Sequence, residues 1–199
     1  MGISEYISNK SMKLIKNSLD KTDTELEQIQ YGIDSLLANI IKLIILFATA
    51  YFLGITKYTF IAVISFGAIR AFASGIHASS SLQCIITNYI IFFGNVYLSL
   101  FLKLNKIHIT LIFVLSLCLV ILYAPADTAA KPLVSKKARK KLKILSILAV
   151  IFLYVLSMSL KNSIYSNLVS LSVLIESILT TPLIYKIFKS EYRNYEKYK

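Results

Sequence analysis

The sequence of 199 residues contains no tryptophan, two cysteines, three prolines and six glycines, and it has only 10 acidic residues beside 22 lysines and arginines. Charged residues make up 16% of the chain and hydrophobic residues 56%, whereas a typical soluble domain has about 25% charged residues. Two cysteines are too few for a disulfide-stabilised secreted scaffold, so we interpret both as free thiols. The scarcity of charge excludes an ordinary soluble domain and predicts a multispanning membrane protein.

The apolar residues fall into six long segments, at 36–55, 58–76, 82–102, 108–124, 144–160 and 164–188. Each is long enough, or nearly so, to cross a hydrocarbon core of about 30 Å as a helix, although the first two contain the basic residues Lys42 and Arg70. Pro125 closes the fourth segment, and Pro182 lies inside the sixth, where a kink is tolerated. We therefore predict one all-α integral membrane domain over 1–199, with about six transmembrane helices forming a bundle over 36–188.

Residues 1–35 are polar, and their apolar residues recur at helical spacing. This pattern predicts an N-terminal amphipathic helix that lies on the membrane surface, or a solvated helix that packs on the rest of the protein. The segment has no apolar core followed by a small-residue cleavage site, so we expect no cleaved secretory signal.

Seven lysines and arginines, and no acid, lie between residues 131 and 143. Basic residues in short loops stay on the cytoplasmic side, so this basic loop is expected there. Counting spans in both directions then places both termini in the cytoplasm, including the basic tail 189–199. Because the net charge of +12 is concentrated beside the membrane, we expect anionic lipid at the cytoplasmic face and no nucleic acid as partner.

His77 and Cys84 lie between the second and third apolar segments, with six residues between them. A thiolate is a nucleophile, and a neighbouring imidazole can activate it and later protonate a leaving amine, which is the minimum for a cysteine peptidase. On one straight helix the two residues would stand about 10 Å apart along the axis. The chemistry therefore needs a helix break, which Gly75 and the serines at 79–81 favour. Alternatively, His77 is an interfacial residue and Cys84 a small apolar filler.

The remaining polar residues suggest further roles. Glu176 is costly in lipid and should face a partner, either Arg70 or Lys42, to orient His77 or to form a purely structural ion pair. The side chain of Gln83, or the backbone amide next to it, could stabilise an oxyanion.

Three further residues are given no part in the proposed chemistry. Asp127 is expected to cap a loop. His108 lies on the opposite membrane face and Cys118 in the fourth segment, so we expect no metal site and no cofactor.

Two stretches carry a family resemblance: R-A-F-A-S-G-I-H-A-S-S-S-L-Q-C at 70–84 and Y-A-P-A-D-T-A-A-K-P at 123–132. Together with N-I-I-K-L at 39–43 and I-E-S-I-L-T-T-P at 175–182, the sequence resembles the accessory gene regulator B family. These are membrane peptidases that process autoinducing peptide precursors in Gram-positive quorum sensing. The resemblance implies that Cys84 is the nucleophile and His77 its base. The supporting or substrate-binding residues that it implies are Arg70, Ser80, Ser81, Lys131 and Glu176.

The resemblance also implies the reaction and the partners. We expect a membrane cysteine endopeptidase that removes the acidic C-terminal tail of a precursor peptide through an acyl thioester and supports its cyclisation to a thiolactone or lactone. A homodimer is plausible on the same basis. Relatives can carry several lysines before the K-P pair, whereas this chain has only Lys131, so tail binding would shift to 136–143. The alternatives are a small transporter that uses Arg70 and Glu176, and a non-catalytic membrane adaptor.

Overall fold

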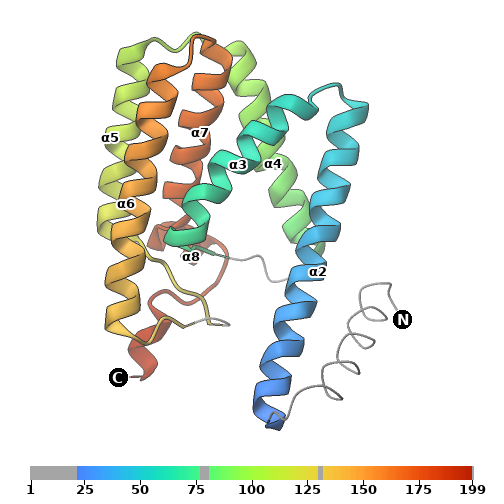
Figure 1. Ribbon diagram of the computed structural model, residues 1–199, viewed down its shortest axis with the longest axis vertical. Coiled ribbons are helices and arrows are strands. Elements are labelled where there is room, and N and C mark those ends of the chain that lie inside the picture. The colour runs from blue at the N-terminus through green and yellow to red at the C-terminus, as the bar shows by residue number, and fades with distance from the viewer. Residues whose placement is uncertain (1–21, 77–80, 130–131, 199) are drawn as a thin grey trace. The chain divides into compact units, whose positions relative to one another are not determined.

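The computed structural model describes residues 22–76, 81–129 and 132–198, which are mainly helical (Figure 1). The helices are α2 (Asp23–Phe52), α3 (Thr56–Ala73), α4 (Ser81–Phe101), α5 (Lys106–Tyr123), α6 (Lys136–Ser159), α7 (Ser163–Leu179) and α8 (Pro182–Ile187), and a 3-10 turn, η1 (Asn194–Tyr198), follows them. An isolated parallel β-bridge joins Ser74 to Ala126. The predicted all-α membrane fold is confirmed.

The first five predicted apolar segments each fall mainly within one helix, and the sixth covers two. Among the described residues, four helices contain stretches long and apolar enough to cross a membrane: α2 from Gly32 onward, α4, α5 and α6. The α3 helix includes two basic residues, Lys57 and Arg70, and α7 has only 17 residues. Both are largely enclosed by neighbouring helices, since α7 packs against α3, α4, α5 and α6, and α3 packs against α4, α6 and α7.

The described residues group into two compact units, Met1–Phe52 and Leu53–Lys199. In the first unit, α2 runs without interruption from Asp23 to Phe52 and so joins the polar residues 23–35 to the first apolar segment. Its apolar residues Leu36, Ile40 and Ile44 are exposed, as expected for a helix surface that faces lipid. Residues 1–21, where most of the predicted amphipathic helix falls, are outside the described ranges.

The structure changes the expected boundaries at two places. The sixth apolar segment is two helices, because α7 ends at Leu179 and Pro182, which has no N–H to donate, begins α8. Most of the predicted basic loop is helical, because α6 begins at Lys136. The Ser135 hydroxyl caps that helix by accepting a hydrogen bond from the amide of Ala138 at 3.3 Å.

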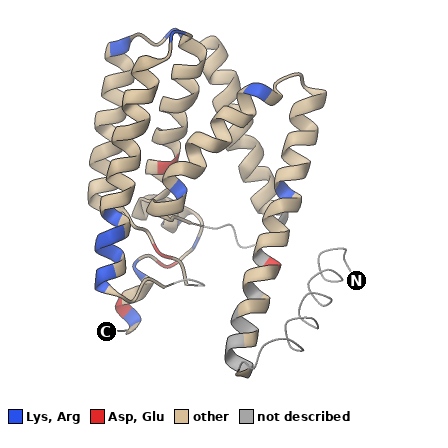
Figure 2. Ribbon diagram, viewed as in Figure 1, with Lys and Arg blue, Asp and Glu red and all other residues tan. Residues whose placement is uncertain are grey.

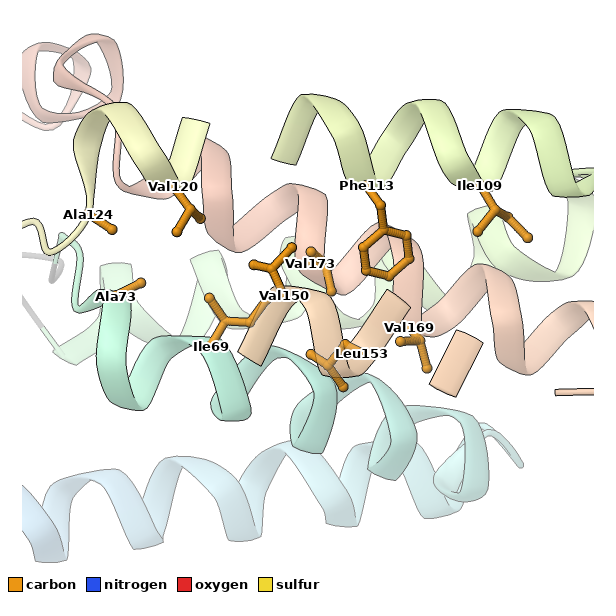
Figure 3. Packing of buried hydrophobic residues seen from close by; sticks show 10 residues of the cluster. All are labelled: Ile69, Ala73, Ile109, Phe113, Val120, Ala124, Val150, Leu153, Val169 and Val173. Atoms are coloured by element: carbon orange, nitrogen blue, oxygen red, sulfur yellow. The ribbon is translucent and has the colours of Figure 1, made fainter. Parts of the chain in front are cut away.

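The hydrophobic core of the second unit lies between α3, α5, α6 and α7 (Figure 3). Branched and aromatic side chains from all four helices meet there, and most are fully buried. The members of this cluster are Ile69, Ala73, Ile109, Phe113, Val120, Ala124, Val150, Leu153, Val169 and Val173.

The central helix α7 is unusually polar on its buried surface, where it carries Ser166, Asn167, Ser170, Ser172, Glu176 and Ser177. Asn95 of α4 donates to the Ser172 hydroxyl at 2.7 Å, and Asn167 donates to the carbonyl of Leu102 at 2.8 Å. Small side chains let helices approach closely, and polar groups without access to water must find partners inside the bundle. The serines therefore adapt α7 to a position surrounded by other helices.

Successive helices of the second unit alternate in direction, so the connections after α3, α5 and α7 lie at the same end (Figure 1). We call this the basic end, because it carries the N-terminal part of α6 and the C-terminal tail, where lysines and arginines gather (Figure 2). The described segments at this end are 74–76, 124–129, 132–135 and 180–198. This topology brings together residues that are far apart in the sequence.

Candidate functional site

A buried ion pair joins α3 to α7 near the basic end. Arg70 lies in the last turn of α3, and its Nη1 is 3.3 Å from both carboxylate oxygens of Glu176. The Glu176 side chain is fully buried, whereas the Arg70 side chain keeps 21% of its surface exposed. Of the two partners that the sequence left open for Glu176, the structure places Arg70 beside it.

The same guanidinium also holds the chain that leads to His77. Nη2 of Arg70 donates to the carbonyl oxygen of Gly75 at 3.3 Å and also to that of Ile76. Gly75 has φ +129°, and a Cβ atom there would lie 2.6 Å from Nη1 of Arg70. Glycine is therefore required both for the backbone conformation and for the close approach of the arginine.

A second connection fixes this segment from the other side. The Gly75 amide donates to the carbonyl of Ala126 at 2.8 Å, and the Ala126 amide donates to the carbonyl of Ala73 at 2.8 Å. Tyr185 of α8 donates its hydroxyl to the carbonyls of Ala126 and Asp127, at 3.1 and 2.8 Å. Residues 73–75, 124–127 and 185 thus form one hydrogen-bonded platform.

Asp127 ties the C-terminal tail to the same platform. Its buried carboxylate accepts hydrogen bonds from the amides of Asn194, Tyr195 and Leu133, at 2.9, 2.8 and 3.1 Å. The bond to Leu133 fits the expected loop-capping role. The two bonds to the tail were not predicted from the sequence, and neither was the burial of Tyr185.

The chain leaves the helical conformation before His77, because α3 ends at Ala73 and residues 74–76 are not helical, and the next described helix, α4, begins at Ser81. Cys84 and Gln83 are half-buried in the first turn of α4. Cys84 is a free thiol, as is the exposed Cys118 on α5. Three predicted site residues, His77, Ser80 and Lys131, lie outside the described ranges.

His108 has a structural role away from these residues. It lies in the first turn of α5, where its amide donates to the Asn105 side chain at 3.0 Å and its Nδ1 accepts from the Asn105 amide at 3.5 Å. In the described part of the chain, no three histidine, cysteine, aspartate or glutamate residues lie close enough to hold a metal ion.

The described site therefore consists of a thiol at the start of α4 and a platform that holds the chain directly before His77. Together with the apolar helices, this arrangement defines a helical membrane protein whose chain is anchored at one end of the bundle directly before His77. The chain belongs to the accessory gene regulator B family, whose sequence model matches residues 4–180. The family takes part in accessory gene regulation and quorum sensing.

Curated relatives extend over most of this chain. It is 34% identical to an AgrB-like protein of Clostridium acetobutylicum over 94% of this chain and 90% of the relative. It is 33% identical to accessory gene regulator protein B of Staphylococcus aureus over 85% of this chain and 89% of the relative. An AgrB-like protein of Listeria innocua is 29% identical, over 86% and 84% of the two chains. No solved structure matches the chain.

Proposed function

We propose that this protein is a membrane cysteine endopeptidase that removes the acidic C-terminal tail of an autoinducing peptide precursor, with Cys84 as nucleophile and His77 as its base. The observation that carries the proposal is the pair of hydrogen bonds that Arg70 donates to the carbonyls of Gly75 and Ile76, immediately before His77. A half-buried arginine that fixes two backbone carbonyls next to a histidine is suited to positioning that histidine. Membership of the family supports the same activity.

The proposed reaction has two acyl-transfer steps. His77 takes the proton from the Cys84 thiol, the thiolate attacks the scissile carbonyl, and the amine of the acidic tail leaves with the proton from the imidazolium. The remaining peptide is then an acyl thioester on Cys84. A thiol or hydroxyl of the same peptide attacks that carbonyl, a thiolactone or lactone closes, and Cys84 leaves as the thiolate.

The other predicted residues have supporting roles in this proposal. Arg70 and Glu176 are positioning residues, because they contact the chain before His77 and not the reacting atoms. Gln83 lies one residue from the nucleophile, in the same turn of α4, where its side chain can help to stabilise the oxyanion. Ser80 and Ser81 lie between His77 and Cys84 in the sequence and have supporting roles, and Lys131 contributes to binding of the acidic tail.

We also propose that the basic end faces the cytoplasm of a cell-membrane protein, with both termini on that side. The basic residues at 136–143 and the basic tail lie at this end, whereas Lys103 and Lys161 lie in connections at the other end and Lys106 begins α5 there. This distribution fits the retention of positive charge on the cytoplasmic side. The proposed orientation brings Cys84 to the side on which a newly made precursor is available.

The proposal is tested by cleavage of an acidic-tailed precursor by the full-length protein in liposomes, followed by mass spectrometry. Cys84→Ser should reduce cleavage at least a hundredfold, because a hydroxyl is a far weaker nucleophile than a thiolate at neutral pH. The control Cys118→Ser should cleave at the rate of the unaltered protein. The unaltered protein should also show a mass increase equal to the acyl peptide, and Cys84→Ser should not show it. Full processing by Cys84→Ser would overturn the assignment.

A further inference from the structure

A pocket of about 280 Å³ lies at the basic end between the end of α5, the start of α6 and the C-terminal tail. Four cationic side chains and three tyrosines line it, and no lining residue is acidic. The lining residues are Leu122, Tyr123, Ala124, Pro125, Arg139, Lys140, Lys143, Tyr192, Arg193 and Tyr195. Arg193 also lies 3.8 Å from the exposed carboxylate of Glu196, which neutralises part of its charge. The remaining concentration of positive charge predicts an anionic ligand.

The cations of the pocket differ in how firmly they are held. Arg139 is fixed, since its Nη1 donates to the carbonyl of Val134 at 2.7 Å and its guanidinium lies 4.0 Å from the ring centre of Tyr195. Within the described ranges, neither Lys140 nor Lys143 has a carboxylate within salt-bridge distance. Their two ammonium groups are therefore available to a ligand.

The pocket also adjoins an apolar surface of the helices that span the membrane. Leu122, which lines the pocket, is 62% exposed. Ile144 and Leu148, one and two turns along α6 from Lys140, are also exposed. An apolar helix surface thus continues from the basic pocket in the direction of the bilayer.

The tyrosines are suited to the boundary between these two environments, because an aromatic ring with a polar tip is favoured at a membrane interface. Burial raises the pKa of the Tyr192 phenol above its usual value, so this side chain keeps its proton at neutral pH and can donate a hydrogen bond. The pocket therefore combines cations, a hydrogen-bond donor and an apolar rim.

We propose that this pocket binds the headgroup of an anionic phospholipid, with the phosphate between Lys140, Lys143 and Arg193 and the acyl chains along Leu122 and α6. Basic pockets at the membrane-facing ends of transmembrane helices are suited to such headgroups. An acidic peptide would satisfy the cations but would leave the apolar rim without a partner. The inference does not depend on the peptidase activity.

The test is native mass spectrometry of the full-length protein purified in detergent and mixed with phosphatidylglycerol or phosphatidylcholine. We expect phosphatidylglycerol to remain bound to the unaltered protein, and Lys140→Gln/Lys143→Gln to reduce the bound fraction at least fivefold. The matched control is Lys137→Gln/Lys141→Gln, which removes the same charge from exposed residues of α6 outside the pocket. It should retain at least half of the bound lipid. The charge-preserving Lys140→Arg/Lys143→Arg should retain it as well.

Three outcomes would overturn the inference. An equal loss of bound phosphatidylglycerol in Lys140→Gln/Lys143→Gln and in Lys137→Gln/Lys141→Gln would show that the lipid adsorbs through net charge alone. Binding of inorganic phosphate that depends on Lys140 and Lys143 and fully displaces the lipid would show a site for a free anion. Binding of a short polyglutamate peptide with the same dependence, without retention of phosphatidylglycerol, would assign the pocket to an acidic peptide.

Discussion

The guanidinium of Arg70 lies 3.3 Å from the carboxylate of Glu176, a residue 106 positions further along the chain. One nitrogen of Arg70 faces this carboxylate, and the other donates to the backbone before His77. A single side chain therefore connects a helix at the centre of the bundle to residues 75 and 76, directly before His77. Any change at Glu176 should consequently affect this segment as well as the helix.

The first prediction concerns the stability and the positioning role of this pair. Arg70→Leu leaves the Glu176 carboxylate buried without its partner, which should destabilise the fold by about 3–5 kcal/mol. Thermal unfolding in detergent, followed by circular dichroism, measures this loss. Precursor cleavage by the same variant should fall at least tenfold.

The double variant Arg70→Leu/Glu176→Leu separates the two roles. It should recover most of the thermal stability, because neither charge remains buried, but it should not recover cleavage, because the carbonyls of Gly75 and Ile76 still lack the guanidinium. Recovery of cleavage together with stability would show that the ion pair is only structural.

The second prediction concerns Gly75. Gly75→Ala should reduce precursor cleavage at least tenfold, because alanine is strained at φ +129° and its Cβ would collide with Arg70. Gly67→Ala in α3 is the control, since its Cβ would meet no atom within 4 Å, and cleavage should be unchanged. Initial rates measured at equal amounts of membrane-inserted protein make the comparison. Equal activity of the two variants would contradict the importance of this contact.

The third prediction concerns the attachment of the tail to Asp127. Asp127→Asn loses a charged acceptor for three backbone amides and places an amide group against at least one of them, which should cost about 1.5–3 kcal/mol per charged bond lost. Limited proteolysis should then cut residues 190–199 several times faster than in the unaltered protein. Glu191→Gln is the control, because its ion pair with Lys197 is exposed and contributes little. Unchanged protection of the tail in Asp127→Asn would refute its anchoring role.

The fourth prediction concerns membrane orientation. Reporter fusions after residues 135 and 199 should both show a cytoplasmic location, and a fusion at Asn105 should show the opposite side. Asn105 caps α5 at the end of the bundle opposite to the basic end, so it distinguishes the proposed topology. A cytoplasmic signal at Asn105 would require a different number of spans before it, and the segments that contain Lys42 and Arg70 would be the first to re-examine.

The sequence predicted the helical segments well because the length and apolar character of a segment largely determine whether it forms a membrane helix. It also predicted the break before Cys84, since glycine and serines are local signals. It could not predict that Asp127 binds the amides of Asn194 and Tyr195, which are 67 and 68 residues away. Such contacts depend on which helix ends meet in space, and neither hydropathy nor periodicity carries that information.

The basic run illustrates a different limit of sequence reading. A lysine-rich segment between two apolar segments suggests a loop. The residues that follow the Ser135 cap are good helix formers, however, so α6 begins at Lys136 and includes the basic residues before its apolar part. The charges are consequently arranged by helical spacing. Lys140 and Lys143 line the pocket with Arg139, whereas Lys137 and Lys141 do not.

The central position of α7 has a consequence for how the protein is made. Chains are synthesised from the N-terminus, so α3, α4, α5 and α6 are complete before the helix that touches all four of them exists. Until then Asn95 lacks the serine to which it donates, and Arg70 lacks its carboxylate. The bundle is completed by its last long helix. A chain that ends before residue 163 lacks α7, the helix against which α3, α4, α5 and α6 pack.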